Sequence, residues 1–175
     1  MMGKLIDKIS PGEALMIIQQ LAKTDKNIKK KIEEIAEGIV RDVDFENICD
    51  DVLSVLNAIY VEDLWDRSGA TQYGYVTPED MAIEMVEEEL DPFNQKIFRL
   101  CELNMQKEAK LYCMGVLKGI YKYDQESKSE FKDWAADVPG ECFSYLFDKW
   151  KKLNNNGVDI EEMNSFLKKE CGQWA

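Results

Sequence analysis

Hydrophobic residues recur with helical spacing along most of the 175-residue chain. After the start signal Ser10-Pro11-Gly12-Glu13, an apolar residue returns every three or four positions, which places one stripe on a helix. After a break at Lys23-Thr24-Asp25 the same spacing continues through Ile28, Ile32, Ile35 and Ile39. A third, wider stripe runs from Phe45 to Ile59, with Asp44 placed to cap it. The pattern predicts three amphipathic helices joined by short connections.

The second half of the chain repeats the helical pattern. Thr77-Pro78-Glu79-Asp80 predicts a helix start, and Asp91-Pro92 predicts a kink or a new start, because proline cannot donate the ladder hydrogen bond. The clearest helix runs from Met105 to Tyr123 and contains Gly115 and Gly119, four residues apart. Glycine is costly in a helix, so this pair predicts close approach of another backbone. Further helices are expected to start at Pro139 and at Asp159, with Glu162 completing the cap of the last one.

No stretch shows convincing strand alternation, so the sequence predicts an all-α fold. We expect about seven amphipathic helices as antiparallel pairs, arranged as a helical bundle or a short HEAT/TPR-like α-solenoid. A length of 175 residues predicts a single domain over residues 1–175. Two halves, 1–60 and 77–175, joined by an ordered loop over 61–76, are the alternative organisation.

The loop over 61–76 is the longest piece without a clear helical period, and it is rich in aromatic residues. Arg67 next to aromatic rings and carboxylates has the composition of a cation–π contact and a charge-assisted pair. One interpretation is a surface or pocket for a peptide or small ligand. The alternative is a structural plug, in which the aromatic residues enter the core and Asp63 or Asp66 neutralises Arg67. The candidate ligand- or partner-binding residues are Trp65, Asp66, Arg67, Tyr73 and Tyr75.

The charge balance narrows the class of partner. The net charge is −12, which argues against nucleic acid and against an anionic membrane as partners. The lysines at 29–31 are interpreted as a solvated helix face. No apolar run approaches the length of a membrane span, and Met-Met-Gly-Lys-Leu-Ile-Asp lacks the apolar core of a signal peptide. We therefore expect a cytoplasmic protein with a protein partner, and homo-oligomerisation stays open.

The residue types disfavour an enzyme. Histidine is absent, which removes His-based nucleophile pairs, His metal ligands and His acid–base catalysis. The five cysteines are dispersed and lie on or beside apolar stripes, so we expect buried reduced thiols. The segment 147–162 resembles a calcium loop, but either register places a lysine where the first aspartate is needed. The sequence predicts no metal site, no cofactor and no catalytic residues, and it leaves enzyme activity undecided with the balance against it.

Two segments resemble a helical region of uncharacterised archaeal and bacterial proteins. They are Val61-Glu-Asp-Leu-Trp-Asp-Arg-Ser-Gly-Ala-Thr-Gln-Tyr-Gly-Tyr-Val, and the stretch from Glu89-Leu-Asp-Pro-Phe to Leu117-Lys-Gly-Ile-Tyr. The resemblance covers Asp44 to Gly140. Some of those proteins also carry a SWIM-type zinc finger, which needs paired cysteines and a histidine that this chain lacks. The resemblance implies a helical accessory domain, similar to helical-repeat interaction modules.

These observations favour a non-enzymatic interaction or scaffold domain that binds a basic or aromatic-bearing protein segment. The alternative function is a small-ligand binder or enzyme with a pocket built around Trp65, Arg67, Tyr73 and Tyr75. An enclosed pocket lined by those residues would favour the alternative.

Overall fold

The computed structural model describes residues 8–41, 43–72, 74–172 and 174. The chain divides into two compact units, residues 1–42 and 43–175. In the first, α2 (Pro11–Thr24) and α3 (Lys26–Arg41) form a helical hairpin. The predicted capping box is confirmed: the Glu13 amide donates to Ser10 Oγ and the Ser10 amide donates to Glu13 Oε2. Asp25 ends α2 and starts α3, since its Oδ1 accepts from the Asn27 amide at 2.7 Å.

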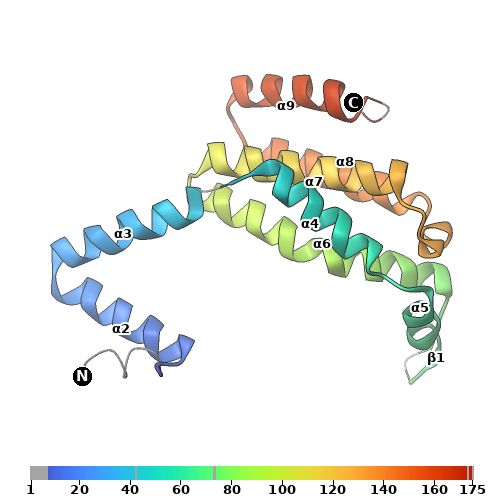
Figure 1. The fold of residues 1–175 in the computed structure, drawn as a ribbon, viewed down its shortest axis with the longest axis horizontal. Helices are drawn as coiled ribbons and strands as arrows, with labels where there is room; N and C mark the ends of the chain where they lie inside the picture. Colours follow the sequence, from blue (N-terminus) through green and yellow to red (C-terminus); the bar gives the residue numbers. More distant parts are fainter. Residues whose placement is uncertain (1–7, 42, 73, 173, 175) are drawn as a thin grey trace. The chain divides into compact units, whose positions relative to one another are not determined.

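The second unit is built around α7, which α4, α6, α8 and α9 all contact. Figure 1 shows these helices grouped together. The unit also holds a 3-10 helix, η1 (Glu130–Trp134). The α-helices of this group are α4 (Phe45–Asn57), α6 (Pro78–Glu102), α7 (Gln106–Glu126), α8 (Val138–Leu153) and α9 (Gly157–Glu170).

Two glycines bring α4 and α7 into close contact. A Cβ added at Gly115 would lie 2.6 Å from the Phe45 carbonyl oxygen, and one at Gly119 would lie 2.7 Å from Val52 Cβ. Non-bonded carbon atoms are most stable roughly 3.5–4.0 Å apart, so no side chain fits at either position. The predicted close approach of another backbone is confirmed, and the backbone concerned belongs to α4.

Proline 92 does not divide the helix that contains it. α6 continues from Pro78 to Glu102 without a new start. Leu90 and Ile97, on either side of the proline, are both buried, while Pro92 itself is exposed. The missing hydrogen bond therefore falls on the outer side, and the packing of the inner stripe keeps one continuous helix.

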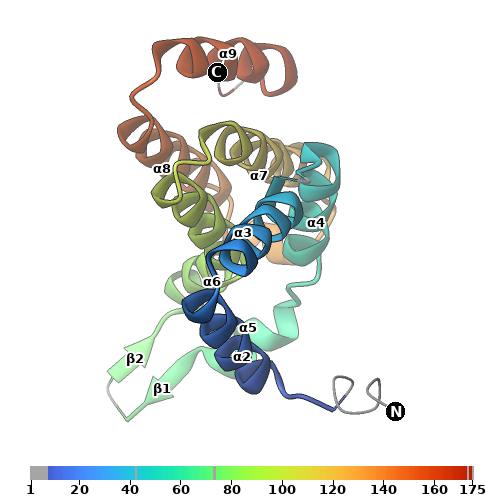
Figure 2. The ribbon, with the colours of Figure 1, turned by 90° about the vertical axis from the view of Figure 1, so that its left-hand side faces the viewer.

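The expected loop over 61–76 is ordered secondary structure. Val61–Arg67 is a helix, α5, followed by a hairpin of β1 (Gly69–Thr71) and β2 (Gly74–Val76). The strands pair antiparallel with Ala70 opposite Tyr75 (Figure 2). Gly69 and Gly74 have φ values of +105° and +140°, a backbone region that glycine adopts without a Cβ penalty. The loop assignment was wrong because α5 is only 7 residues long, too short to show a helical period.

The fold is all-α, as predicted, with eight α-helices and one small two-stranded sheet in the described part of the chain. The boundary between the two compact units lies between residues 42 and 43, whereas the sequence predicted a single domain, with a division at 61–76 as the alternative. Residues 61–76 do not separate two units, because α4 lies before them in the sequence and α7 lies after them, yet the glycine contact packs α4 against α7.

Candidate functional site

The aromatic residues of α5 lie on the surface of the second unit. Leu64 is fully buried and anchors α5, while Trp65 is 51% exposed. Trp65 packs edge-on against Trp134 of η1, with ring centroids 4.9 Å apart. Trp65 therefore neither enters the core, as the plug interpretation expects, nor stands alone as a free binding residue.

Arg67 is bound to the neighbouring helix. Its Nη2 lies 2.8 Å from Glu88 Oε2 on α6, instead of pairing with Asp63 or Asp66. A depression of about 220 Å³ beside Arg67 includes Asp63, Asp66 and Glu89 in its lining. Tyr75 on β2 is 71% exposed and does not line that depression, and Tyr73 lies outside the described residues. Of the four predicted site residues that the structure describes, only Asp66 and Arg67 line the same depression.

A larger groove lies on the other side of α6, between α6 and α8. It has a volume of about 390 Å³, within the range of roughly 300–1,000 Å³ that is typical of ligand sites. Leu90 and Val138 are buried in its floor, and Ile83 is 38% exposed. The residues that line it come from successive turns of the two helices: Ile83, Glu87, Leu90, Asp91, Asn94, Val138, Glu141, Cys142 and Tyr145.

Three carboxylates surround this apolar floor. Glu87 and Asp91 are one helical turn apart on α6, and Glu141 faces them from α8; all three are exposed. No lysine or arginine is among the described residues that line the groove. Opposite charges therefore do not neutralise the acids from within the groove, and the site favours a cationic group with an apolar stem. The neighbouring glutamates Glu87 and Glu88 therefore differ in their surroundings: Glu87 lines the groove, and Glu88 pairs with Arg67.

Polar groups of the groove add two features. The side-chain oxygen of Asn94 is buried and accepts no hydrogen bond in the structure, which leaves an acceptor in the lining. Cys142 is the only cysteine of the five that is not buried, and all five are described and free. Burial, with Glu87 and Glu141 nearby, raises the pKa of the Cys142 thiol to about 11. At neutral pH this thiol is protonated, so it is a poor nucleophile.

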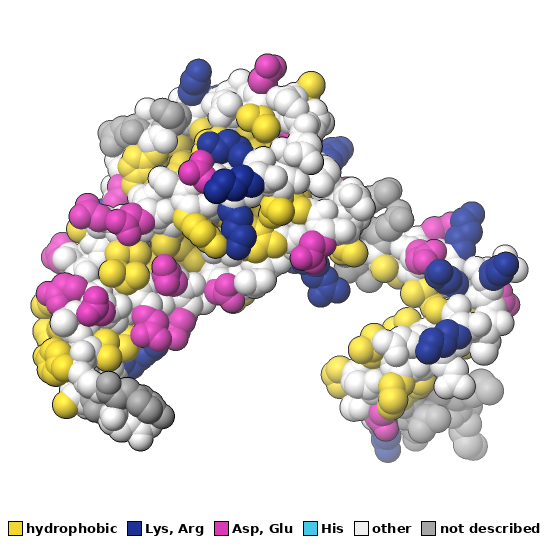
Figure 3. All heavy atoms as spheres, turned by 180° about the vertical axis from the view of Figure 1, so that it is seen from behind, with side chains coloured by type: hydrophobic (Ala, Val, Ile, Leu, Met, Phe, Trp, Pro, Cys, Tyr) yellow, Lys and Arg dark blue, Asp and Glu magenta, His cyan; other side chains and the backbone are white. Residues whose placement is uncertain are grey.

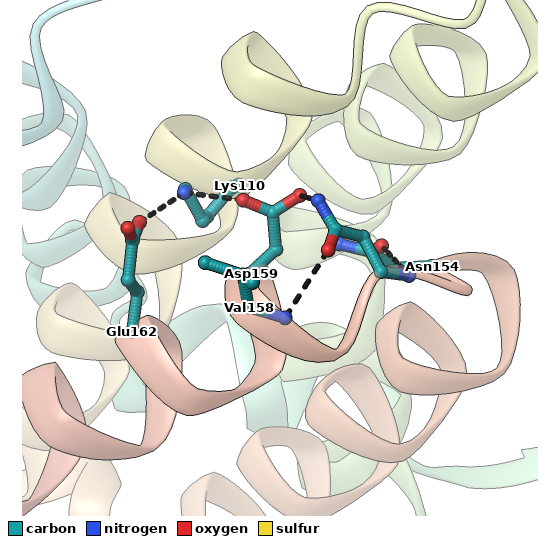
Figure 4. Close-up of polar contacts among 6 residues, drawn as sticks. Lys110, Asn154, Val158, Asp159 and Glu162 are labelled. Carbon is teal, nitrogen blue, oxygen red and sulfur yellow. Dashed lines mark hydrogen bonds and ion pairs between the residues drawn. The ribbon is translucent and has the colours of Figure 1, made fainter.

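The strongest buried charge cluster lies between α7 and α9 (Figure 4). Lys110 is 8% exposed and its Nζ contacts Asp159 Oδ1 at 2.5 Å and Glu162 Oε2. The sequence assigned Asp159 and Glu162 to the cap of α9, and this was wrong. Asn156 is the cap, since its Oδ1 accepts from the Val158 amide at 3.1 Å, and its own amide group donates to Asp159 Oδ2.

Lys110 remains a cation in this environment. Burial lowers its pKa, but the hydrogen bonds and charges of Asp159 and Glu162 outweigh burial, and the net shift is upward. A lysine that acts as a nucleophile needs a lowered pKa. The cluster is therefore an ionic connection between α7 and α9, and its chemistry is structural. Lys118 makes a similar connection from α7 to Glu46 on α4 and Glu170 on α9.

The sequence did not single out the groove. Glu87 and Asp91 are four residues apart beside Ile83 and Leu90, which indicates a helix edge where acidic and apolar residues meet. The α8 side of the groove is more than 40 residues away in sequence, and nothing local signals that it faces α6. Among the described residues, no group of three or more His, Cys, Asp or Glu side chains is placed to hold a metal ion. No described helix has the length and apolar character needed to span a membrane.

Comparisons of the chain with protein-family models, curated proteins and solved structures found no match.

Proposed function

We propose that this protein is a non-enzymatic interaction module that holds a basic segment of a partner protein in the groove between α6 and α8. The observation that carries this proposal is the pairing of an apolar floor with Glu87, Asp91 and Glu141 and no lining cation. A lysine or arginine side chain fits such a site, because its methylene stem packs on Leu90 and Val138 while its head reaches the carboxylates.

The charge of the second unit supports the same class of partner. Residues 43–175 contain 27 acidic and 14 basic residues. Figure 3 shows acidic side chains among hydrophobic ones over much of the drawn face of this unit, with a group of basic side chains near its middle. Such a field raises the rate of encounter with basic partners and disfavours acidic ones.

The absence of an activated group in the groove supports binding over catalysis. The Cys142 thiol has a pKa raised to about 11, and a catalytic thiol needs a lowered one. The alternative function, a small-ligand site built around Trp65, Arg67, Tyr73 and Tyr75, stays a prediction.

A peptide-binding measurement tests the proposal. A synthetic peptide of alternating lysine and leucine, with a glutamate–leucine peptide of equal length as comparison, is titrated into the full chain and followed by calorimetry. We expect the lysine peptide to bind and the glutamate peptide not to bind. Equal binding of both peptides would contradict the proposed groove.

Matched variants separate the groove from the general charge of the protein. The triple variant Glu87→Gln, Asp91→Asn, Glu141→Gln removes three charges from the groove. The triple variant Glu102→Gln, Glu126→Gln, Glu161→Gln removes three charges from exposed positions that do not line it. We expect the groove variant to weaken lysine-peptide binding by about tenfold or more and the control to change it about twofold or less.

A further inference from the structure

A lysine stands at one end of the groove between α6 and α8. Tyr145 lines the groove, and its hydroxyl accepts a hydrogen bond of 2.9 Å from Nζ of Lys149, one turn further along α8. The same ammonium group lies 4.0 Å from the ring centroid of Phe98 on α6. Phe98 follows Asn94, which lines the groove, by one helical turn. Lys149 therefore crosses from α8 to α6 directly beyond the groove.

This ammonium group has no anionic partner of its own. The adjacent Asp148 pairs with Lys151 at 2.7 Å, and Lys149 makes no ion pair within the described part of the chain. An ammonium group has three N–H donors, of which the Tyr145 hydroxyl takes one. An aromatic face attracts a cation without neutralising its charge. A carboxylate from a partner can therefore form a charge-assisted hydrogen bond with this half-buried lysine.

The groove itself carries the opposite charge. Glu87 and Asp91 contribute carboxylates from α6, and Glu141 contributes one from α8. Phe98 lies nine residues beyond the midpoint of Glu87 and Asp91. At a rise of 1.5 Å per residue, the acidic part of the groove and the ammonium group of Lys149 are about 13 Å apart along α6. The charge thus changes sign along one continuous surface.

This distance matches the repeat of an extended chain. An extended chain rises about 3.3 Å per residue and places every second side chain on the same face. Two residues four positions apart are then about 13 Å apart and point the same way. In an α-helix the same distance takes about nine residues, which leaves the two side chains half a turn apart. The spacing therefore favours an extended segment over a helical one.

We propose that the groove binds an extended segment in which a basic and an acidic residue lie four positions apart, with the acidic residue held by Lys149. The basic residue occupies the site of Glu87, Asp91 and Glu141, and the residue midway between the two charges packs on the apolar floor. This inference rests on the proposed binding of a basic segment in the groove. It adds Lys149 as the residue that selects a partner with charges of both signs over a uniformly basic one.

Titration of the full chain with capped peptides, followed by NMR, tests the proposal. The first peptide is Gly-Lys-Ser-Leu-Ser-Glu-Gly, and the second has alanine in place of glutamate. The third, Gly-Lys-Ser-Leu-Glu-Ser-Gly, has the composition and charge of the first, but its acid points to the opposite face of an extended chain. We expect the first peptide to bind about five- to tenfold more tightly than either of the others. An acid without a local partner should weaken binding to a chain of net charge −12.

A substitution of the lysine assigns the effect to its charge. Lys149→Met keeps an unbranched apolar stem beside Phe98 and removes the ammonium group. We expect it to abolish the advantage of the first peptide and to change the affinity of the alanine peptide about twofold or less. Lys152→Met is the matched control, because Lys152 is an exposed lysine of the same helix, and it should keep the advantage. Circular dichroism establishes that both variants are folded.

The outcomes separate this inference from the function on which it rests. Equal binding of the first and second peptides, equal binding of the first and third, or an advantage that survives Lys149→Met would each overturn the role of Lys149. The proposed function stands in these cases if the alanine peptide binds wild type and is weakened by Glu87→Gln, Asp91→Asn, Glu141→Gln. If no peptide binds wild type, the proposed function fails and this inference fails with it.

Discussion

The two units of this chain solve the same packing problem in different ways. Residues 43–175 enclose an apolar core in which Leu56, Leu117 and Trp150 are completely buried. The α2–α3 hairpin has the same amphipathic spacing, yet α2 contains no buried residue. The difference lies in the number of neighbours. α7 is contacted by four helices, whereas α2 and α3 have mainly each other, so equal helical patterns yield a core in one unit and an exposed face in the other.

The largest expected contrast comes from the same substitution in each unit. Leu117→Ala on α7 creates a cavity at a fully buried position, and we expect it to lower the free energy of unfolding by about 2–5 kcal/mol. Leu15→Ala on α2, at a position 56% exposed, should change it by about 0.5 kcal/mol or less. Urea unfolding of the two variants beside the wild type measures both changes. Similar losses at the two positions would mean that the hairpin has a core of its own.

Glycine-to-alanine substitutions should change the free energy of unfolding in opposite directions in the two units. At Gly119 the new Cβ would lie 2.7 Å from Val52 Cβ and 2.8 Å from the Cys49 carbonyl oxygen. We expect Gly119→Ala to destabilise the second unit by about 1–3 kcal/mol despite the better helix propensity of alanine. At Gly38 on α3 nothing lies within 4 Å of the new atom, so Gly38→Ala should stabilise the helix by up to about 1 kcal/mol. Thermal and chemical unfolding of both variants give the two signs, and a neutral Gly119→Ala would show that α4 can move away from α7.

The ionic connection of α9 to α7 is expected to matter less than the core. Lys110→Met leaves Asp159, whose side chain is 13% exposed, without its cation. We expect a loss of about 1–3 kcal/mol and faster hydrogen exchange confined to α9. Lys169→Met is the matched control, because Lys169 is 81% exposed and pairs only with its neighbour Glu170 among the described contacts. Equal exchange of α9 amides in both variants would show that the ion pairs of Lys110 do not hold α9 on α7.

The smallest expected effect is a loss of stability of α9 at acid pH. Hydrogen bonds from Lys169 and Lys118 lower the pKa of Glu170 below its ordinary value of 4.5. A lowered carboxyl pKa contributes stability above the unfolded value, and this contribution is lost as the pH falls through the folded value. We therefore expect exchange of α9 to accelerate as the pH falls below 4.5, after correction for intrinsic exchange. In Glu170→Gln this acid step should shrink; an unchanged step would assign it to other carboxylates.

Raising the pH should also weaken the ion pairs between Lys118 and its glutamates, because the lysine then loses its proton. Hydrogen bonds to Glu46 and Glu170 outweigh burial and raise the pKa of Lys118 to about 12. A raised lysine pKa contributes stability that is complete below the ordinary value of 10.5 and is lost as the pH rises through 12. The connection of α7 to α4 and α9 is therefore expected to hold throughout the neutral range.

The sequence alone determined the longer helices and several of their starts. Ser10, Asp44 and Thr77 accept hydrogen bonds from the amides of the helices that follow them, as predicted. These caps are local, because the donor lies two or three residues from the acceptor. The periodic apolar stripes likewise predicted the all-α fold, since helical spacing requires only one segment at a time.

Only the tertiary structure decided which segments meet. Gly115 and Gly119 indicated a close contact, but the sequence did not say that α4 supplies it. Arg67 pairs with Glu88 instead of a nearby aspartate, and Asp159 pairs with Lys110, 49 residues away. The acidic groove forms only where α6 and α8 lie side by side, and the sequence pattern of one helix indicates the residues of that helix alone. Local spacing thus specified each helix and its apolar face, whereas the close packing of several faces at once determined the neighbours and the site between them.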